Sequence, residues 1–185
     1  MSDIILLLGG NLGDRYGYLQ KAKAAIQCRI GELMEVSAIY ETACWGGDQQ
    51  PDYLNQALRI HTRLLPEQVL DEALRIETQL GRVRTRMWEP RVMDIDLIFY
   101  DRLIYHSERL ILPHPRIAVR RFVLMPLAEI IPDYIHPVHQ QTIVELLNRC
   151  TDTSAVSYWS PHLHHVPSVL KAASIDLPSP TTSGA

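Results

Sequence analysis

Lysine is scarce in this sequence, and a strong excess of charge of either sign is absent. Only three of the 185 residues are lysines, and the formal net charge is −3 at pH 7. Such a balance gives no electrostatic basis for general nucleic-acid binding. No apolar run approaches the about 20 residues of a membrane-spanning helix, and the run that follows Asp3 is too short for a signal peptide. We therefore expect a soluble, cytoplasmic monomer without nucleic-acid or membrane partners.

Cysteine pairs and the common phosphate-binding loops are also missing. The three cysteines, Cys28, Cys44 and Cys150, are widely spaced and form no CxxC motif, which argues against a disulfide framework or a zinc site. The sequence contains no G-x-x-x-x-G-K-[ST] motif, which excludes a P-loop enzyme, and GGNLGD does not satisfy G-x-G-x-x-G. Any phosphate chemistry must therefore depend on other residues.

The pattern of apolar residues predicts alternating strands and helices. Strands are expected at 4–8, 33–42, 53–63 and 94–100, a hairpin-like return at 103–104, helices at 14–30, 66–80 and 141–149, and one or two short helices before the last. This order predicts an α/β or α+β sandwich, with helices packed on a mixed or antiparallel sheet. We expect one domain at 1–149, and a Ser/Thr/Pro-rich appendage at 150–185.

The strand expected at 94–100 carries two aspartates in an apolar run. Alternation places Asp94, Asp96, Ile98 and Tyr100 on one face and Ile95, Leu97 and Phe99 on the other, core-facing side. The Cα atoms of the two aspartates are then roughly 6.6 Å apart, so their carboxylates can share divalent cations. Oxygen-only ligands favour magnesium, which also binds substrate phosphates. The alternative is that both aspartates only form ion pairs with nearby arginines.

Arginines are concentrated just before this strand. Arg82, Arg84, Arg86 and Arg91 fall within ten residues, and planar guanidinium groups suit phosphates and carboxylates. Together with the aspartates they favour a site that positions and neutralises a polyphosphate. Glu77, near the end of the preceding helix, could either form an ion pair with an arginine or hold a ribose hydroxyl; its spacing fits both.

A second group of residues suits an aromatic heterocycle. Tyr53 and Asn55 project from one face of their strand, so that an amide could match the heterocycle's edge while an aromatic ring stacks on its face. Trp45, in a Gly-rich loop, and Phe122 could add stacking surface. Tyr53 and Asn55 alone are weak evidence for such a site, because tyrosine and asparagine are common near strand starts.

Five segments together resemble 6-hydroxymethyl-7,8-dihydropterin pyrophosphokinase, a family of folate-pathway enzymes. The segments are GGNLGD, QQPDYLNQAL, IETQLGRVR, WEPRVMDIDLIFYD and LPHPRIAVRRFVLMPL, and the resemblance spans roughly residues 4–147. It implies a ferredoxin-like fold and transfer of a pyrophosphoryl group from ATP to the pterin's hydroxymethyl oxygen, releasing AMP, with two magnesium ions. Glu89 departs from the family pattern, because a glycine is frequent at its position.

The resemblance also implies a role for each matching residue. Asp94 and Asp96 would bind the metals, and Arg82 and Arg91 would act with them in catalysis on the phosphates. ATP would be bound by Glu77, Arg84, Trp88, Ile98, Arg109, His114 and Arg120. The pterin would be bound by Thr42, Cys44, Trp45, Tyr53, Asn55, Trp88 and Phe122.

Two other functions remain open from the residues themselves. A D-x-D nucleotide-sugar or nucleotidyl transferase would explain the aspartates and arginines, but would leave Tyr53 and Asn55 without a role. A non-catalytic module that recognises an anionic partner through its arginines would leave the aspartates unused.

Overall fold

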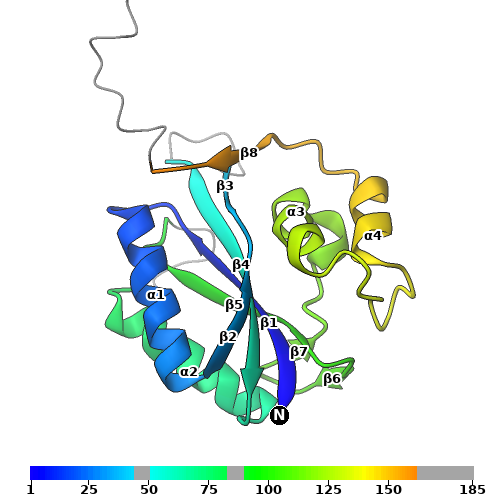
Figure 1. Ribbon diagram of the computed structural model, residues 1–185, viewed down its shortest axis with the longest axis horizontal. Coiled ribbons are helices and arrows are strands. Elements are labelled where there is room, and N and C mark those ends of the chain that lie inside the picture. The colour runs from blue at the N-terminus through cyan, green and yellow to red at the C-terminus, as the bar shows by residue number, and fades with distance from the viewer. Residues whose placement is uncertain (44–50, 83–89, 162–185) are drawn as a thin grey trace, which may run out of the picture.

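The computed structural model describes residues 1–43, 51–82 and 90–161, in which strands and helices alternate (Figure 1). In chain order the elements are β1 (Ser2–Gly10), α1 (Arg15–Arg29), β2 (Gly31–Val36), β3 (Ile39–Thr42), β4 (Tyr53–Thr62), α2 (Pro66–Gln79), β5 (Asp94–Tyr100), β6 (Tyr105–His106), β7 (Ile111–Leu112), the 3-10 helix η1 (Ile117–Val119), α3 (Arg121–Ile130), α4 (Ile143–Arg149) and β8 (Val156–Trp159). No helix of these residues is long and apolar enough to cross a membrane.

The main sheet has six strands in the order β5-β1-β4-β3-β8, and β2 also pairs with β4. Every pairing in it is antiparallel. The two β-α-β units, from β1 to β2/β3 and from β4 to β5, interleave so that β1 and β4 lie at the centre. This is the ferredoxin-like α+β arrangement, so the predicted fold class is confirmed, with an antiparallel sheet.

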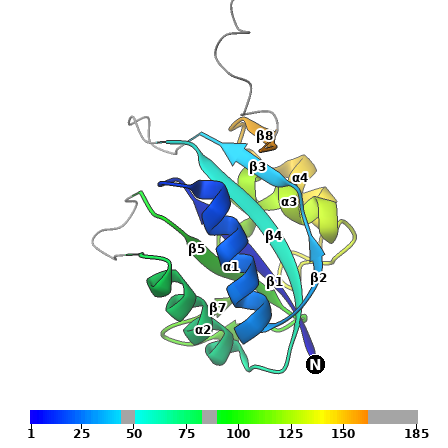
Figure 2. The same ribbon diagram turned by 60° about the vertical axis from the view of Figure 1, so that its left-hand side comes forward.

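Helices cover both faces of this sheet. Figures 1 and 2 show α1 and α2 on one face and α3 and α4 on the other. One apolar cluster joins β1 side chains such as Leu6 to Leu19 and Ile26 of α1, and a second joins Leu7 to Leu127 of α3. Successive β1 residues therefore point to opposite faces and both are buried, which explains why β1 is apolar throughout.

The predicted helix starts agree with the structure. The Asp14 carboxylate accepts a hydrogen bond from the Gly17 amide at 2.9 Å, so it caps α1. Pro66 occupies the first turn of α2, where its missing N–H costs nothing. Gly31 follows the C-cap residue Ile30 and begins β2. Its place requires glycine, because a Cβ there would lie 2.1 Å from the His61 carbonyl oxygen.

The single strand expected at 33–42 is wrong, because the chain forms β2 and β3 with a break at residues 37–38. Ser37 is 3% exposed. Its hydroxyl donates to the Ala38 carbonyl at 2.7 Å and accepts from the Ala57 amide at 2.9 Å. The Ser37 hydroxyl thus accepts from the Ala57 amide in place of a backbone carbonyl. On the two sides of this residue, β2 and β3 pair with different parts of β4.

A β-bulge in β5 overturns the alternation predicted beyond Ile98. Leu6 pairs with Leu97, whereas Ile5 pairs with Phe99, so Ile98 is an extra residue. Phe99 therefore lies in the cluster under α3, and Tyr100 returns to the cluster under α1 and α2. Asp94 and Asp96 precede the bulge and keep the face predicted for them.

One further expectation is corrected. Residues 103–104 form no returning strand; the Leu103 amide closes a turn onto the Tyr100 carbonyl, and β6 and β7 form a separate two-stranded sheet. Within the segment expected as an appendage, residues 156–159 form β8, which pairs with β3, and the Tyr158 ring lies 4.9 Å from that of Tyr40. The rest of that segment, 162–185, lies outside the described residues.

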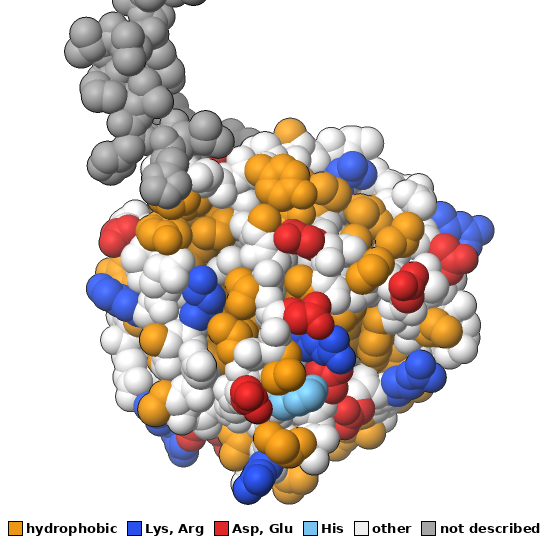
Figure 3. Space-filling view, in the orientation of Figure 1, with side chains coloured by type: hydrophobic (Ala, Val, Ile, Leu, Met, Phe, Trp, Pro, Cys, Tyr) orange, Lys and Arg blue, Asp and Glu red, His pale blue; other side chains and the backbone are white. Residues whose placement is uncertain are grey.

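Charged side chains of both signs are interspersed over the described part of the face in Figure 3. In the described part of the chain, several charged side chains form ion pairs between elements that are distant in sequence. Arg59 of β4, for example, pairs with Asp3 at 2.9 Å and with Glu35 at 2.7 Å. Such exposed pairs contribute little to stability, about 0–1 kcal/mol each.

Candidate active site

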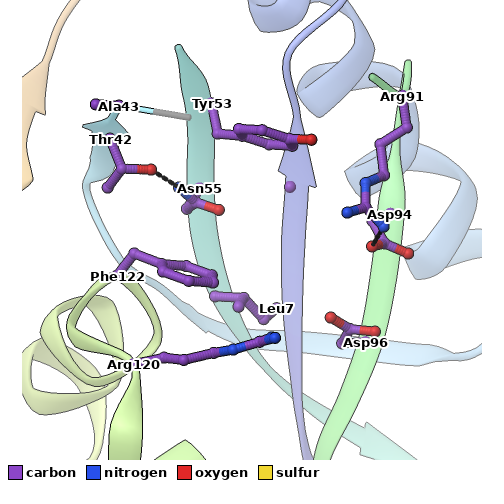
Figure 4. Close-up of a pocket in the computed structure, with 11 residues that line it drawn as sticks. Leu7, Thr42, Ala43, Tyr53, Asn55, Arg91, Asp94, Asp96, Arg120 and Phe122 are labelled. Atoms are coloured by element: carbon purple, nitrogen blue, oxygen red, sulfur yellow. Dashed lines mark hydrogen bonds and ion pairs between the residues drawn. The ribbon is translucent and has the colours of Figure 1, made fainter. Parts of the chain in front are cut away.

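A cavity lies on the α3 side of the sheet, where β3, β4, β1 and β5 approach one another (Figure 4). Its lining residues are Leu7, Gly9, Thr42, Ala43, Tyr53, Asn55, Arg91, Asp94, Asp96, Arg120 and Phe122. In Figure 4 the amide and aromatic side chains lie on the β3 and β4 side, and the carboxylates and Arg91 lie on the β5 side. The two groups of residues singled out from the sequence therefore meet at one cavity.

The two aspartates of β5 have different surroundings. Asp94 is held by two arginines: Arg82 contacts its Oδ1, and Nη1 of Arg91 lies 2.6 Å from its Oδ2. Burial raises the pKa of Asp96 to about 7, and repulsion from Asp94 and Glu77 adds to this effect. The alternative of ion pairing with arginines is therefore observed for Asp94, while Asp96 carries an electrostatic cost that a cation would relieve.

The donor set fits magnesium. Among the described residues no group of three or more His, Cys, Asp or Glu side chains gathers to hold a metal. Asp94 and Asp96, which both line the cavity, would supply two carboxylates to such an ion. Magnesium in nucleotide-binding enzymes is commonly held in this way.

Glu77 connects α2 to the start of β5. It is only 2% exposed. Its Oε1 accepts from the Ile95 amide at 2.9 Å and lies 2.7 Å from Nη1 of Arg82. Of the two roles that its spacing left open, the ion pair with an arginine is the one that the structure contains.

Arg91 reaches toward both sides of the cavity. Besides its pair with Asp94, its guanidinium carbon lies 5.8 Å from the centroid of the Tyr53 ring. Its Nε is buried and has no hydrogen-bond partner within the described residues. A buried donor without a partner is costly, so this atom is suited to an anionic ligand.

The opposite wall is built by Asn55 and Thr42. Asn55 is 2% exposed and donates from Nδ2 to the Thr42 hydroxyl at 3.0 Å, and Figure 4 shows its oxygen directed toward the cavity. Gly9 on β1 leaves room for this oxygen, since a Cβ there would lie 3.2 Å from it. Phe122 forms the adjoining surface, with the Arg120 guanidinium 5.6 Å from its ring centroid.

Four predicted ATP-binding residues do not line this cavity: Glu77, described above, and Ile98, Arg109 and His114. Ile98 is 1% exposed and packs in the apolar cluster under α3. Arg109 pairs with Asp71 of α2 at 2.5 Å. The His114 amide donates to the Ile98 carbonyl at 3.0 Å, and burial together with nearby arginines lowers the pKa of His114 to about 4.

Four other predicted site residues, Arg84, Trp88, Cys44 and Trp45, lie outside the described residues. Conversely, Asn11 was not predicted. Its backbone amide donates to the Arg91 carbonyl at 3.0 Å, and its side chain accepts from the Arg91 amide at 2.9 Å. The only sequence signal for it was its place in GGNLGD, directly after a buried strand.

Comparisons with known proteins give a consistent result. The family model described as 7,8-dihydro-6-hydroxymethylpterin-pyrophosphokinase (HPPK) matches residues 5–132. A 2-amino-4-hydroxy-6-hydroxymethyldihydropteridine pyrophosphokinase of Synechocystis is 40% identical over 157 residues, which are 84% of this chain and 80% of that protein. One of Bacillus subtilis is 40% identical over 155 residues, 83% of this chain and 88% of that protein.

The solved structures agree on the fold. An HPPK-DHPS chain of Plasmodium falciparum superposes with a TM-score of 0.68 at 16% identity. The match covers 80% of the present chain and 45% of the parasite chain, so this chain spans less than half of that protein. At such low identity the likeness concerns the fold alone.

Proposed function

Because this chain belongs to the 7,8-dihydro-6-hydroxymethylpterin-pyrophosphokinase family, it is an ATP-dependent pyrophosphokinase of folate biosynthesis, and we propose that the cavity between β4 and β5 is its active site. The reaction transfers the terminal pyrophosphoryl group of ATP to the hydroxymethyl oxygen of 6-hydroxymethyl-7,8-dihydropterin. The products are the pterin diphosphate and AMP. The observation that supports this assignment is that a carboxylate and arginine wall faces an amide and aromatic wall across one cavity.

The β5 wall is the triphosphate side. Arg91 lines the cavity, and its buried Nε is a donor available for a phosphate oxygen. Arg82 lies behind it, held by Glu77 and Asp94. These cations would neutralise the triphosphate and fix its orientation, which is the main catalytic requirement of phosphoryl-type transfer. Asp94 and Asp96 would hold magnesium, which would supply Lewis-acid stabilisation of the charge that develops on the phosphates.

The β4 wall is the pterin side. Asn55 donates to Thr42, and this contact fixes its amide so that the oxygen faces the cavity. An amide oxygen in that position can accept from the N–H groups on the pterin's edge. Tyr53 and Phe122 supply ring surface for the bicycle. The attacking oxygen belongs to the substrate, so the enzyme needs no nucleophile of its own.

The test of this function is direct. The protein is mixed with magnesium, ATP and 6-hydroxymethyl-7,8-dihydropterin, and nucleotide products are separated by chromatography. AMP should accumulate in proportion to the pterin diphosphate. Formation of ADP alone, or of no product, would contradict the proposal. We also propose that the enzyme is a cytoplasmic monomer; sedimentation of the purified chain tests the oligomeric state.

A further inference from the structure

Asn11 holds the backbone of Arg91 at two atoms. It is 1% exposed and lies in the connection between β1 and α1. Its amide donates to the Arg91 carbonyl at 3.0 Å, and its Oδ1 accepts from the Arg91 amide at 2.9 Å. Arg91 is thus bound on both sides of its Cα, as in a ladder of paired strands, at the position where its side chain enters the cavity.

The same side chain also reaches the other wall. Nδ2 of Asn11 donates to the Pro51 carbonyl at 3.2 Å, and Pro51 precedes the start of β4 by two residues. Arg15, the first residue of α1, donates to the next carbonyl, that of Asp52, at 2.6 Å. The two residues before Tyr53 are therefore both held by side chains that follow β1.

These contacts fix two residues that face each other. The Arg91 guanidinium lies 5.8 Å from the centroid of the Tyr53 ring. The Asn11 side chain is bonded to the backbone of Arg91 and to that of Pro51, two residues before Tyr53. We propose that Asn11 is a positioning residue that sets the placement of Arg91 relative to Tyr53, and thereby of the triphosphate relative to the pterin hydroxyl. It does not line the cavity, so it acts through Arg91 and Tyr53. This inference rests on the proposed function.

The chemistry of the position requires an amide. One planar group must accept from an N–H and donate to a carbonyl in the same buried place, and only a carboxamide side chain does both in that geometry. Aspartate keeps the acceptor for Arg91 and loses the donor for Pro51, whereas alanine loses both. The two variants, Asn11→Asp and Asn11→Ala, therefore separate the two contacts.

The test compares these variants with a control that breaks a similar contact elsewhere. Thr62 is also 1% exposed, and its hydroxyl binds the Ile30 carbonyl and the Leu64 amide at the far end of β4. Asn11→Ala should lower kcat by roughly 10–100-fold, as the loss of a supporting side chain does in other sites. KM for either substrate should change by less than about threefold. Thr62→Val should lower the free energy of unfolding and leave kcat unchanged.

A double-mutant cycle shows whether Asn11 acts through Arg91. In the Arg91→Ala background, Asn11→Ala should cause no further loss of kcat, whereas multiplicative losses would overturn the inference. Exchange of the Arg91 amide proton in the wild-type protein, followed by NMR, gives a readout that needs no variant. This proton should be protected from solvent, and rapid exchange would also overturn the inference. If the wild-type protein forms no AMP, the proposed function fails. If the wild-type protein forms AMP and the Asn11 variants keep its kcat, the inference alone fails.

Discussion

Replacement of Glu77 separates two contributions that this buried residue makes to the fold. Its Oε1 accepts from the Ile95 amide and pairs with Arg82. Glu77→Gln removes the charge but keeps an oxygen for the Ile95 amide. Glu77→Ala removes both the charge and the acceptor oxygen, so the buried Ile95 N–H loses this partner. Of these two carboxylates, Arg82 then keeps only that of Asp94.

The magnitudes follow from the burial. An unsatisfied buried donor costs about 1–3 kcal/mol, and breaking a buried ion pair costs about 3–5 kcal/mol when the remaining charge has no partner. Because Arg82 retains Asp94, we expect Glu77→Ala to cost about 3 kcal/mol in the free energy of unfolding. Glu77→Gln should cost about 1 kcal/mol, since the hydrogen bond to the strand is preserved.

Urea unfolding followed by tryptophan fluorescence measures this difference. With a slope of about 2 kcal/mol per molar urea, the two midpoints should differ by about 1 M. Glu145 provides the control: it also accepts from a backbone amide, that of Thr142, but it is exposed. Glu145→Ala should shift the urea midpoint much less than Glu77→Ala does, because water replaces the lost acceptor. Equal midpoints for Glu77→Ala and Glu77→Gln would refute the reasoning.

Three further predictions concern single residues. Asp96→Asn should stabilise the ligand-free protein, because it removes repulsion with Asp94 and Glu77. It should also abolish magnesium-dependent AMP formation. Urea unfolding and the AMP assay measure these two effects, and a destabilised or an active variant would contradict the prediction. Asn55→Ala should weaken pterin binding by roughly 10–100-fold, as expected for losing a buried hydrogen bond, with ATP affinity unchanged in calorimetry; equal weakening of both ligands would show a general distortion. His136 has a pKa lowered to about 4, first by burial and then by His139, and its Nδ1 accepts two backbone N–H groups. As the pH drops, the unfolded chain therefore binds a proton at this position before the folded chain does. The free energy of unfolding should fall between about pH 6.5 and 4, by at most about 1.4 kcal/mol per pH unit. The decline should be smaller in His136→Asn, and identical pH profiles of stability for the two proteins would contradict this.

The fold could be predicted because the periodicity of apolar residues determines which elements form, and several residues singled out for the site line one cavity. The stripe of α1 and the apolar run of β1 determine which elements form, and the aspartates of β5 precede the bulge that shifts the alternation. The bulge itself could not be predicted, because Ile98 and Phe99 suit either face. The break between β2 and β3 depends on one serine hydroxyl binding the neighbouring strand, and no local pattern indicates that contact.

The distances within the site also depend on contacts between distant segments. The spacing of Glu77 in the sequence was compatible with two roles. Its hydrogen bond with the Ile95 amide forms because α2 packs beside β5. Arg109 was expected at the ATP, but the β6–β7 segment places it against the first half of α2. Asn11 had no signal beyond its motif, since its partners at 51 and 91 are far away in the sequence.

The pairing of β8 with β3 has a consequence for how the protein is made. Thr42, which orients Asn55, lies opposite Val156 in this pairing. On a ribosome the strands carrying the two aspartates and Tyr53 emerge well before residues 156–159. Until residues 156–159 have been synthesised, the edge of β3 beside the pterin wall has unpaired backbone groups, which can pair with a strand of another chain. Synthesis of residues 156–159 thus covers the open edge of β3 and completes the support of that wall.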